Sequence, residues 1–357
     1  MDGGGVGAAM ADPLASRLRA AIRQQGPMPF SAWMEACLHD PADGFYTRGG
    51  VTGSGPDRHF TTSPALHPFF GAAVAMEAAA AWRALGQPDP FEVVEFGGGE
   101  GGLARAALAW LDAHEPALAA RTRWLHAERS PAHRAMQAAG GDPRVGAGDG
   151  GVAGRSVFVV ANEFVDALPF EWLERAADGA GWSRVCVGVG ADGGFREALE
   201  PCPPPGVPNV APGTRCAVMR EAARWLEGLA QARRVVALVV DYGERGQRLW
   251  DGSRPDGTVR GYRGHAFAPV LAAPGEADIT ASVDFSFLRQ AAEAAGLAEA
   301  SFETQEAFLL RHGILDELNR TERATMEGAS SYLRLRQLLL PTGMGTAFKV
   351  ARYVKQT

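Results

Sequence analysis

The sequence predicts an α/β fold with a Rossmann-like parallel sheet and helices on both of its faces. From Phe91 onward, short apolar runs alternate with helical stretches, which is the pattern of parallel strands joined by crossover helices. A glycine-dense turn follows the first apolar run, and two more strand candidates come close to the C-terminus. The 357 residues are enough to bury a large core around such a sheet.

The stretch before the sheet is expected to be helical. Residues 1–12 are rich in Gly and Ala and are expected to form a disordered tail, with Met10 as an alternative start. Residues 13–90 are expected to form an N-terminal helical segment that acts as a lid, with Ser31 as the N-cap of its second helix. The predicted helices cover residues 13–25, 27–40 and 68–85, and a Gly-, Ser- and Pro-rich loop is expected at 48–57.

Residues 91–357 are expected to form the sheet domain, with an insertion at about 172–232. A hairpin is predicted over 182–199, followed by a Pro-rich connector, and the insertion is expected to supply substrate-binding elements. A helix is predicted at 284–295. Strands are predicted at 92–95, 122–128, 156–161, 235–241, 298–304 and 346–354, with a weak strand signal before Asp149.

The glycine-dense turn fits two nucleotide-binding patterns. Gly97, Gly99 and Gly102 satisfy G-x-G-x-x-G, the dinucleotide fingerprint. Glu95, Gly97, Gly99 and Gly101 also satisfy E-x-G-x-G-x-G, which is typical of S-adenosylmethionine (SAM) methyltransferases. Glycine allows the sharp turn and lets a ligand approach the backbone. An ordinary glycine-rich turn without a ligand is the third alternative.

Two features favour SAM over a nicotinamide dinucleotide. Glu95 ends the first strand, and a carboxylate there suits a ligand that carries a cationic amino group and no phosphate. The late strand pair also matches the way a class I SAM methyltransferase sheet closes, whereas a dinucleotide dehydrogenase normally adds a second βαβαβ half. We therefore predict a class I SAM-methyltransferase sheet with SAM as the cofactor.

Two further carboxylates are candidate cofactor ligands. Glu128 ends the second strand, where an acid can accept hydrogen bonds from both ribose hydroxyls. Its alternative role is that of a solvated residue at a strand end. Asp149 follows the weak third strand and is a candidate for binding the adenine amino group, with an ordinary turn aspartate as the alternative.

The residues after the strand at 156–161 are the candidate catalytic group. Asn162, Glu163 and Asp166 lie at the carboxyl end of that strand, where ligands of open α/β sheets collect. Methyl transfer requires alignment of the nucleophile and control of its charge. An amide or carboxylate here can hold a nitrogen nucleophile, and the pair Glu163 and Asp166 would suit a guanidinium. The alternative is a helix N-terminus, with Asn162 as its cap.

Composition excludes several classes of function. The net charge of −6 and the absence of a basic run give no sign of nucleic-acid binding. No apolar run approaches the roughly 20 residues of a transmembrane helix, and no signal peptide is recognised. The four cysteines lie far apart, which favours a reducing cytoplasm over a zinc site or disulfides. No metal is expected.

The motifs together resemble the MidA family, whose members are SAM-dependent methyltransferases and whose mitochondrial members assist assembly of respiratory complex I. The resemblance spans nearly the whole chain. It rests on the glycine motif and on PFSAWME (29–35), DPADGFY (40–46), FTTSP (60–64), ERSP (128–131), NEFVDALP (162–169), DYG (241–243), GTVRGY (257–262), DITASVDF (278–285) and MGTAFKV (344–350).

This resemblance implies a methyltransferase that acts on an arginine of a protein substrate, with a complex I subunit as the target of the mitochondrial members. It places SAM against Glu95, Gly97, Gly99 and Glu128. The chain departs from the family pattern at Arg58-His59, where the family usually has Gly-Asp, and at Ala65, where it tends to have an acid. A non-catalytic, SAM-binding assembly chaperone therefore remains the alternative function, and a homodimer is an open alternative for the oligomeric state.

Overall fold

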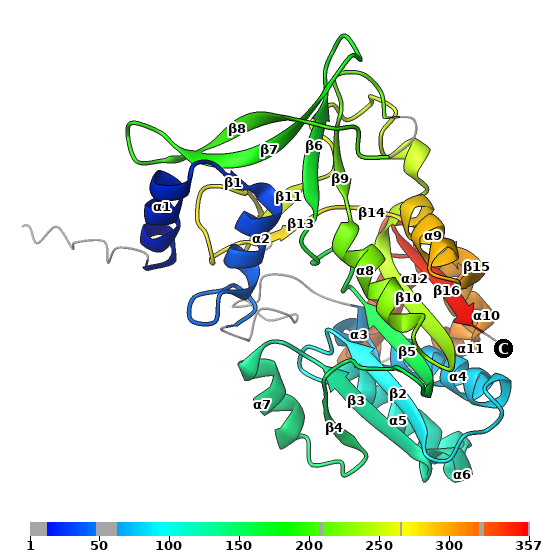
Figure 1. Ribbon diagram of the computed structural model, residues 1–357. Coiled ribbons are helices and arrows are strands. Elements are labelled where there is room, and N and C mark those ends of the chain that lie inside the picture. Colours follow the sequence, from blue (N-terminus) through cyan, green and yellow to red (C-terminus); the bar gives the residue numbers. More distant parts are fainter. Residues whose placement is uncertain (1–12, 48–62, 207–209, 265, 321–324, 356–357) are drawn as a thin grey trace, which may run out of the picture.

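The computed structural model describes residues 13–47, 63–206, 210–264, 266–320 and 325–355 (Figure 1). The expected N-terminal tail, the loop at 48–57 and the Arg58-His59 departure lie outside the described residues.

The main sheet confirms the predicted fold class. Its strand order is β15-β16-β10-β5-β2-β3-β4, with the short β14 beside β10. The five strands from β4 to β10 are parallel, and β16 is antiparallel to both β10 and β15. The late strand pair therefore closes the sheet as predicted. The bounds are β2 Phe91–Phe96, β3 Thr122–Ala127, β4 Val145–Gly148, β5 Ser156–Asn162, β10 Arg234–Glu244, β14 Val283–Asp284, β15 Ala298–Thr304 and β16 Phe348–Lys355.

Helices cover both faces of this sheet because its central strands are apolar on both sides (Figure 1). Val93 and its in-register neighbour Phe158 face one core, whereas Val94 and Val159 face the other. The first core contains residues of α4 Pro68–Ala84, α5 Gly102–His114, α6 Pro116–Ala119, α10 Gln305–Arg311, α11 Ile314–Arg320 and α12 Met326–Leu339. The second contains residues of α8 Arg220–Leu229 and α9 Phe285–Ala294.

A second, antiparallel sheet extends the second core. The predicted hairpin is confirmed as β7 and β8, and the path of the sheet is β1-β7-β6-β9. Helices α1 and α2 pack against β7, so the N-terminal helices share a core with the inserted strands (Figure 1). The bounds are α1 Pro13–Gln25, β1 Met28–Pro29, α2 Phe30–His39, β6 Glu171–Arg175, β7 Trp182–Val189, β8 Phe195–Cys202 and β9 Arg215–Val218.

The prediction of Ser31 as an N-cap is wrong. Helix α2 begins at Phe30, and the residue at its cap position is Pro29, which has no side-chain cap. Met28 and Pro29 instead pair with Val187 and Cys186 of β7. Strand pairing therefore fixes the start of this helix, and the sequence alone could not reveal a partner about 160 residues away in the chain.

A third, small sheet lies between β10 and α9 in the sequence. Its order is β12-β11-β13. The next strand in the chain, β14, pairs in parallel with the end of β10. This segment carries residues to the carboxyl end of β10, where the candidate site lies. The bounds are β11 Arg260–Arg263, β12 Ala266–Ala268 and β13 Asp278–Thr280; the remaining elements are α3 Ser63–Leu66, α7 Pro131–Ala139 and the 3-10 helix η1 Gly246–Arg248.

Candidate active site

The glycine turn after β2 requires glycine at three positions for conformational reasons. Gly97, Gly99 and Gly101 have φ values of 69°, 51° and 76°, in the left-handed region that favours glycine. Gly98 is required for a steric reason, because a Cβ atom there would lie 2.3 Å from Nδ1 of His126. The turn thus passes close to β3 and leads directly into α5.

Glu128 fastens this turn from the end of β3. One carboxylate oxygen accepts a hydrogen bond from the amide of Gly99 (3.0 Å), and the other accepts one from the amide of Ser130 (2.8 Å). Burial alone would raise the pKa of Glu128, but hydrogen bonds from His133 and Ser130 outweigh burial and lower it. Glu128 is therefore a fixed carboxylate in the ligand-free protein.

Glu95 lies beneath the turn and is only 3% exposed. Its Oε2 accepts a hydrogen bond from the Trp124 indole (2.6 Å), and Nδ1 of His126 is 3.3 Å from the same oxygen. Burial raises the pKa of Glu95 to about 8, and repulsion by Glu128 acts in the same direction. A cation that approached Glu95 would favour its ionised form.

These groups surround a cavity of about 590 Å³, which we call the glycine-turn cavity. Glu95, Gly97, Gly99, Glu128 and Glu163 line it together. The volume lies within the range of pockets that hold ligands of cofactor size. The backbone of the glycine turn, the ionised Glu128 and the buried Glu95 together fit a ligand that carries hydroxyls and an amino group.

Two of the predicted cofactor residues do not line this cavity. Asp149 is exposed, and its Oδ1 accepts a hydrogen bond from the amide of Gly151 (2.8 Å), which is the geometry of an ordinary turn aspartate. Gly101 occupies the N-cap position of α5 in a left-handed conformation. Gly101 therefore contributes to the site by allowing the shape of the turn.

The segment after β5 forms a strained turn and no helix. The helix-cap alternative for Asn162 is therefore wrong. Glu163 has a φ of 51°, which is uncommon for a residue with a side chain. Its Oε1 accepts hydrogen bonds from the amide of Ser63 (3.0 Å) and from Nδ2 of Asn162 (3.2 Å).

Asp241 of β10 holds this turn by hydrogen bonds to its backbone. It is fully buried, and its Oδ2 accepts hydrogen bonds from the amides of Val165 (3.0 Å) and Asp166 (3.2 Å). The turn is thereby fixed to the neighbouring strand. Asp241 thereby positions Glu163 and Asp166 at the carboxyl end of the sheet.

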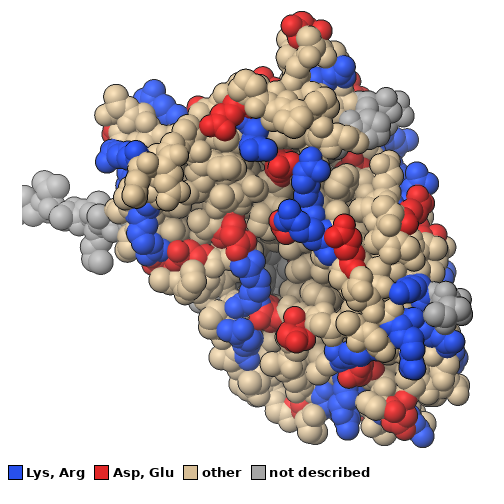
Figure 2. Space-filling view, in the orientation of Figure 1, with Lys and Arg blue, Asp and Glu red and all other residues tan. Residues whose placement is uncertain are grey.

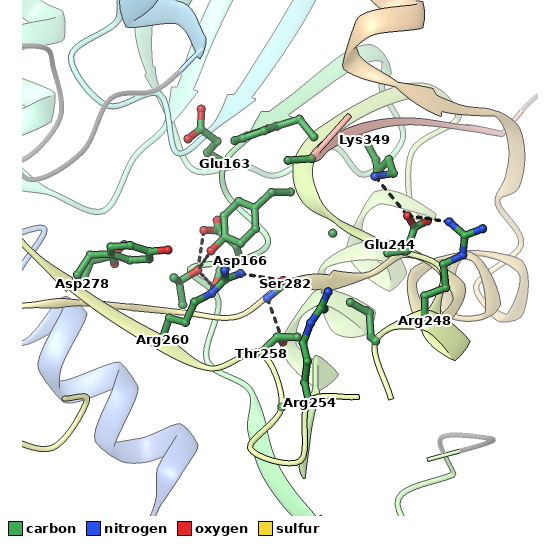
Figure 3. Close-up of a pocket in the computed structure, with 18 of the residues that line it drawn as sticks. Glu163, Asp166, Glu244, Arg248, Arg254, Thr258, Arg260, Asp278, Ser282 and Lys349 are labelled. Atoms are coloured by element: carbon green, nitrogen blue, oxygen red, sulfur yellow. Dashed lines mark hydrogen bonds and ion pairs between the residues drawn. The ribbon is translucent and has the colours of Figure 1, made fainter. Parts of the chain in front are cut away.

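A second cavity of about 870 Å³ adjoins this turn, and we call it the acidic cavity. Glu163, Asp166 and Asp278 line it, and Glu163 and Tyr46 line both cavities. Figure 3 shows Glu163, Asp166 and Asp278 on one part of its wall, and Glu244 and Lys349 on another. Glu163 therefore stands where the two cavities meet.

The carboxyl groups of the acidic cavity are held close together. Asp166 accepts a hydrogen bond from the hydroxyl of Thr280 (2.8 Å), and Asp278 accepts one from Tyr46 (2.8 Å). Burial raises the pKa of Glu163 to about 8 and that of Asp278 to about 7, and repulsion by Asp166 contributes to both. Such a cluster would bind a cation that lowers these pKa values.

Four residues of the site were not predicted as site residues. They are Ser63, Tyr46, Asp241 and Asp278, and each lies within a motif that supports the family resemblance. The motifs therefore contained a signal, but sequence spacing could not connect it to Glu163. Tertiary contacts bring Ser63 and Glu163 together across 100 positions and Tyr46 and Asp278 across 232.

The sheet order, the glycine turn and the adjoining cavities define the class of protein as a class I SAM-dependent methyltransferase. Residues 73–302 match a family model described as "Putative S-adenosyl-L-methionine-dependent methyltransferase". The chain belongs to this family, the MidA family, as its motifs predicted. SAM is its cofactor, which confirms the cofactor prediction.

Relatives extend over most of the chain. The mitochondrial protein arginine methyltransferase NDUFAF7 of Danio rerio is 30% identical over 338 residues, covering 83% of this chain and 76% of the relative. The Drosophila melanogaster homolog is 29% identical over 335 residues, covering 84% and 74%. The crystal structure of a protein from Burkholderia thailandensis contains bound S-adenosyl-homocysteine. It superposes on this chain with a TM-score of 0.84 and 29% sequence identity, and the match covers 96% of this chain and 92% of that chain.

The described residues contain neither a metal-binding cluster nor a membrane-spanning helix. No group of three or more His, Cys, Asp or Glu side chains there is arranged to hold a metal ion. Within the same part of the chain, none of the helices has the length and apolar character needed to span a membrane.

Proposed function

We propose that this chain transfers a methyl group from SAM to the guanidinium of an arginine in a protein substrate, with Glu163 as the central residue on the acceptor side. The single observation that carries the proposal is the position of Glu163 in the walls of both cavities, beside Asp166 and Asp278. The glycine-turn cavity would hold the methyl donor, and the acidic cavity would hold the acceptor.

In this proposal the cofactor is held by the residues of the glycine turn and its neighbours. Glu128 would accept hydrogen bonds from the ribose hydroxyls, Glu95 would face the amino group, and Gly97 and Gly99 would allow close approach of the backbone. Bound SAM supplies an electrophilic methyl group on a sulfonium. Asp149 has no assigned contact, because it lies outside the cavity lining.

On the acceptor side, three carboxyl groups suit a guanidinium. An arginine side chain carries five N–H donors and a permanent positive charge. Oε1 of Glu163 already receives two hydrogen bonds from Ser63 and Asn162, so Oε2 is available to accept one from the guanidinium. Asp166 and Asp278 would compensate the remaining charge and fix the orientation of the acceptor nitrogen.

The names of the relatives support arginine as the acceptor, because the proteins from Danio rerio and Drosophila melanogaster are named protein arginine methyltransferases. The family resemblance further suggests a respiratory complex I subunit as the acceptor protein. A cytoplasmic location stays a prediction from the cysteine pattern.

The test is methyl transfer from labelled SAM to two sets of peptides that differ only in a central arginine or lysine. We expect label in the arginine set, recovered as methylarginine after hydrolysis, and micromolar cofactor binding by calorimetry, equivalent to about −8 kcal/mol. Label in the lysine set alone would overturn the choice of acceptor. Cofactor binding without transfer to arginine peptides or to complex I subunits would favour the non-catalytic assembly factor.

A further inference from the structure

The acidic cavity is also lined by basic residues, which are Arg248, Arg254, Arg260 and Lys349. Arg260 lies beside the carboxyl groups, because it is the cross-strand neighbour of Thr280, which binds Asp166. Figure 3 shows Arg254 and Arg260 pointing into the cavity from the segment between β10 and α9. Figure 2 shows that this face of the molecule is hollowed between its upper and lower halves and that charges of both signs surround the hollow.

Two of these cations form no close ion pair with a carboxylate within the described part of the chain. The Arg260 guanidinium donates to the hydroxyl of Ser282 (2.9 Å) and lies 5.5 Å from the Tyr242 ring centroid, while its buried Nε has no hydrogen-bond partner. Arg254 is exposed and forms no close ion pair with a described carboxylate, although its charge contributes to lowering the pKa of the exposed Asp251. An unpaired buried donor beside a cavity is unfavourable unless a ligand satisfies it.

The other two cations of this cavity are already partnered. Lys349 and Arg248 both face Glu244, with N–O distances of 3.6 Å and 3.8 Å. Lys349 also donates to the backbone oxygen of Thr346 (2.6 Å). The unsatisfied positive charge of the cavity is therefore concentrated at Arg254 and Arg260.

The carboxyl cluster does not neutralise these two arginines. Asp166 is engaged with Thr280, and Asp278 with Tyr46. Glu163 is engaged with Ser63 and Asn162. Neither Arg254 nor Arg260 forms an ion pair with any of the three. The cavity thus offers carboxyl groups to a cation and guanidinium groups to an anion, and the two sets are not paired with each other.

We propose that the substrate carries an Asp or Glu side chain within a few positions of the methylated arginine and that Arg254 and Arg260 receive its carboxylate. This inference rests on the proposed function, since the carboxyl cluster then holds the acceptor arginine. Arginine is well suited to this task because its planar fork can bind a carboxylate through two parallel hydrogen bonds. Complementary charges of this kind select a partner and fix its register.

The test measures binding and methylation of short fluorescent peptides with one central arginine, flanked by Glu, Gln or Lys. We expect the wild-type protein to bind the Glu peptides about three- to tenfold more tightly than the Gln peptides, with the Lys peptides weakest. Arg254→Glu should abolish or reverse this order. Arg260→Gln should reduce it, and cofactor binding should be unchanged in both variants.

Arg289→Glu provides the matched control, because Arg289 is an exposed arginine on α9 that lines neither cavity. This variant should keep the wild-type preference. Should Arg260→Gln fail to fold, the exposed Arg254 still decides the question. Amidated and free-acid versions of the peptides separate a side-chain carboxylate from a C-terminal one.

Three results would overturn the inference: equal binding of Glu and Gln peptides by the wild-type protein, a preference that survives Arg254→Glu, or a preference conferred only by a free C-terminus. Each is distinct from a failure of the proposed function. The function fails if lysine-centred peptides are methylated and arginine-centred ones are not, whatever the flanking residue.

Discussion

The two cavities are built in opposite ways around their carboxylates. In the glycine-turn cavity, Glu128 accepts hydrogen bonds from His133 and from one backbone amide on each oxygen, so its pKa is lowered although it is largely buried. In the acidic cavity, Glu163 receives donors from the described residues on one oxygen only and faces other carboxyl groups, so burial raises its pKa to about 8. Burial raises the pKa at both positions, but hydrogen bonds outweigh it at Glu128 and do not at Glu163. Glu128 is therefore held ionised by its neighbours, whereas Glu163 is suited to bind a cation.

This contrast predicts separable roles, and Glu163→Gln should show the largest effect. The amide keeps the shape of the side chain but removes the charge that would hold and orient a guanidinium. We expect methyl transfer to fall about 10²- to 10⁴-fold, while the dissociation constant for SAM stays within about twofold. Single-turnover kinetics and calorimetry measure the two quantities. Unchanged turnover would remove Glu163 from its proposed role.

Glu128→Gln should give the opposite pattern with a smaller effect. A glutamine would direct an NH₂ group at one of the two backbone amides that Glu128 now binds. We expect the dissociation constant for SAM to rise about 10- to 100-fold, equivalent to roughly 1.4–2.7 kcal/mol. Turnover at saturating cofactor should remain near the wild-type value. If turnover falls while cofactor affinity holds, the assignment of the two cavities is reversed.

The pH dependence should report the acidic cavity. Raised pKa values of about 8 for Glu163 and about 7 for Asp278 mean that both are partly protonated at neutral pH. A permanently charged acceptor binds their ionised forms, so kcat/KM for the acceptor should rise with pH by about a hundredfold per unit below pH 7, by about tenfold between pH 7 and 8, and level off above 8. Glu163→Gln should lose the part of this rise near pH 8. A flat profile in the wild-type protein would contradict this account.

Tyr46→Phe should have the smallest effect. The change removes the hydrogen bond to Asp278 but keeps the ring, so we expect KM for the acceptor to rise about two- to tenfold, equivalent to 0.5–1.5 kcal/mol. Because that hydrogen bond lowers the pKa of Asp278, the lower limb of the pH profile should also move upward. His67→Gln, at the N-cap of α4 and outside both cavity linings, is a control for general destabilisation. An unshifted pH limb would make Tyr46 a packing residue only.

The strands of the main sheet and the position of the glycine turn could be predicted from the sequence because both follow from local patterns. Continuous apolar runs such as residues 235–241 define strands buried on both faces. The spacing from Glu95 to Gly101 defines a turn whose positive φ values require glycine. Glu128 and Glu163 were candidates for the same reason, since each follows a strand in a fold that gathers ligands at the carboxyl ends.

Tertiary structure alone decided the rest, because the deciding contacts join residues far apart in the chain. It set the start of α2 through the strand pairing of Met28 and Pro29, and it left Asp149 outside the cavity lining. It also excluded the alternative of a helix cap at Asn162, because a turn held by Asp241 follows the strand. The sequence by itself determined a methyltransferase sheet and its cofactor turn. The acidic cavity and its unpaired arginines exist only after folding, since charge, burial and pKa depend on neighbours in space rather than on neighbours in sequence.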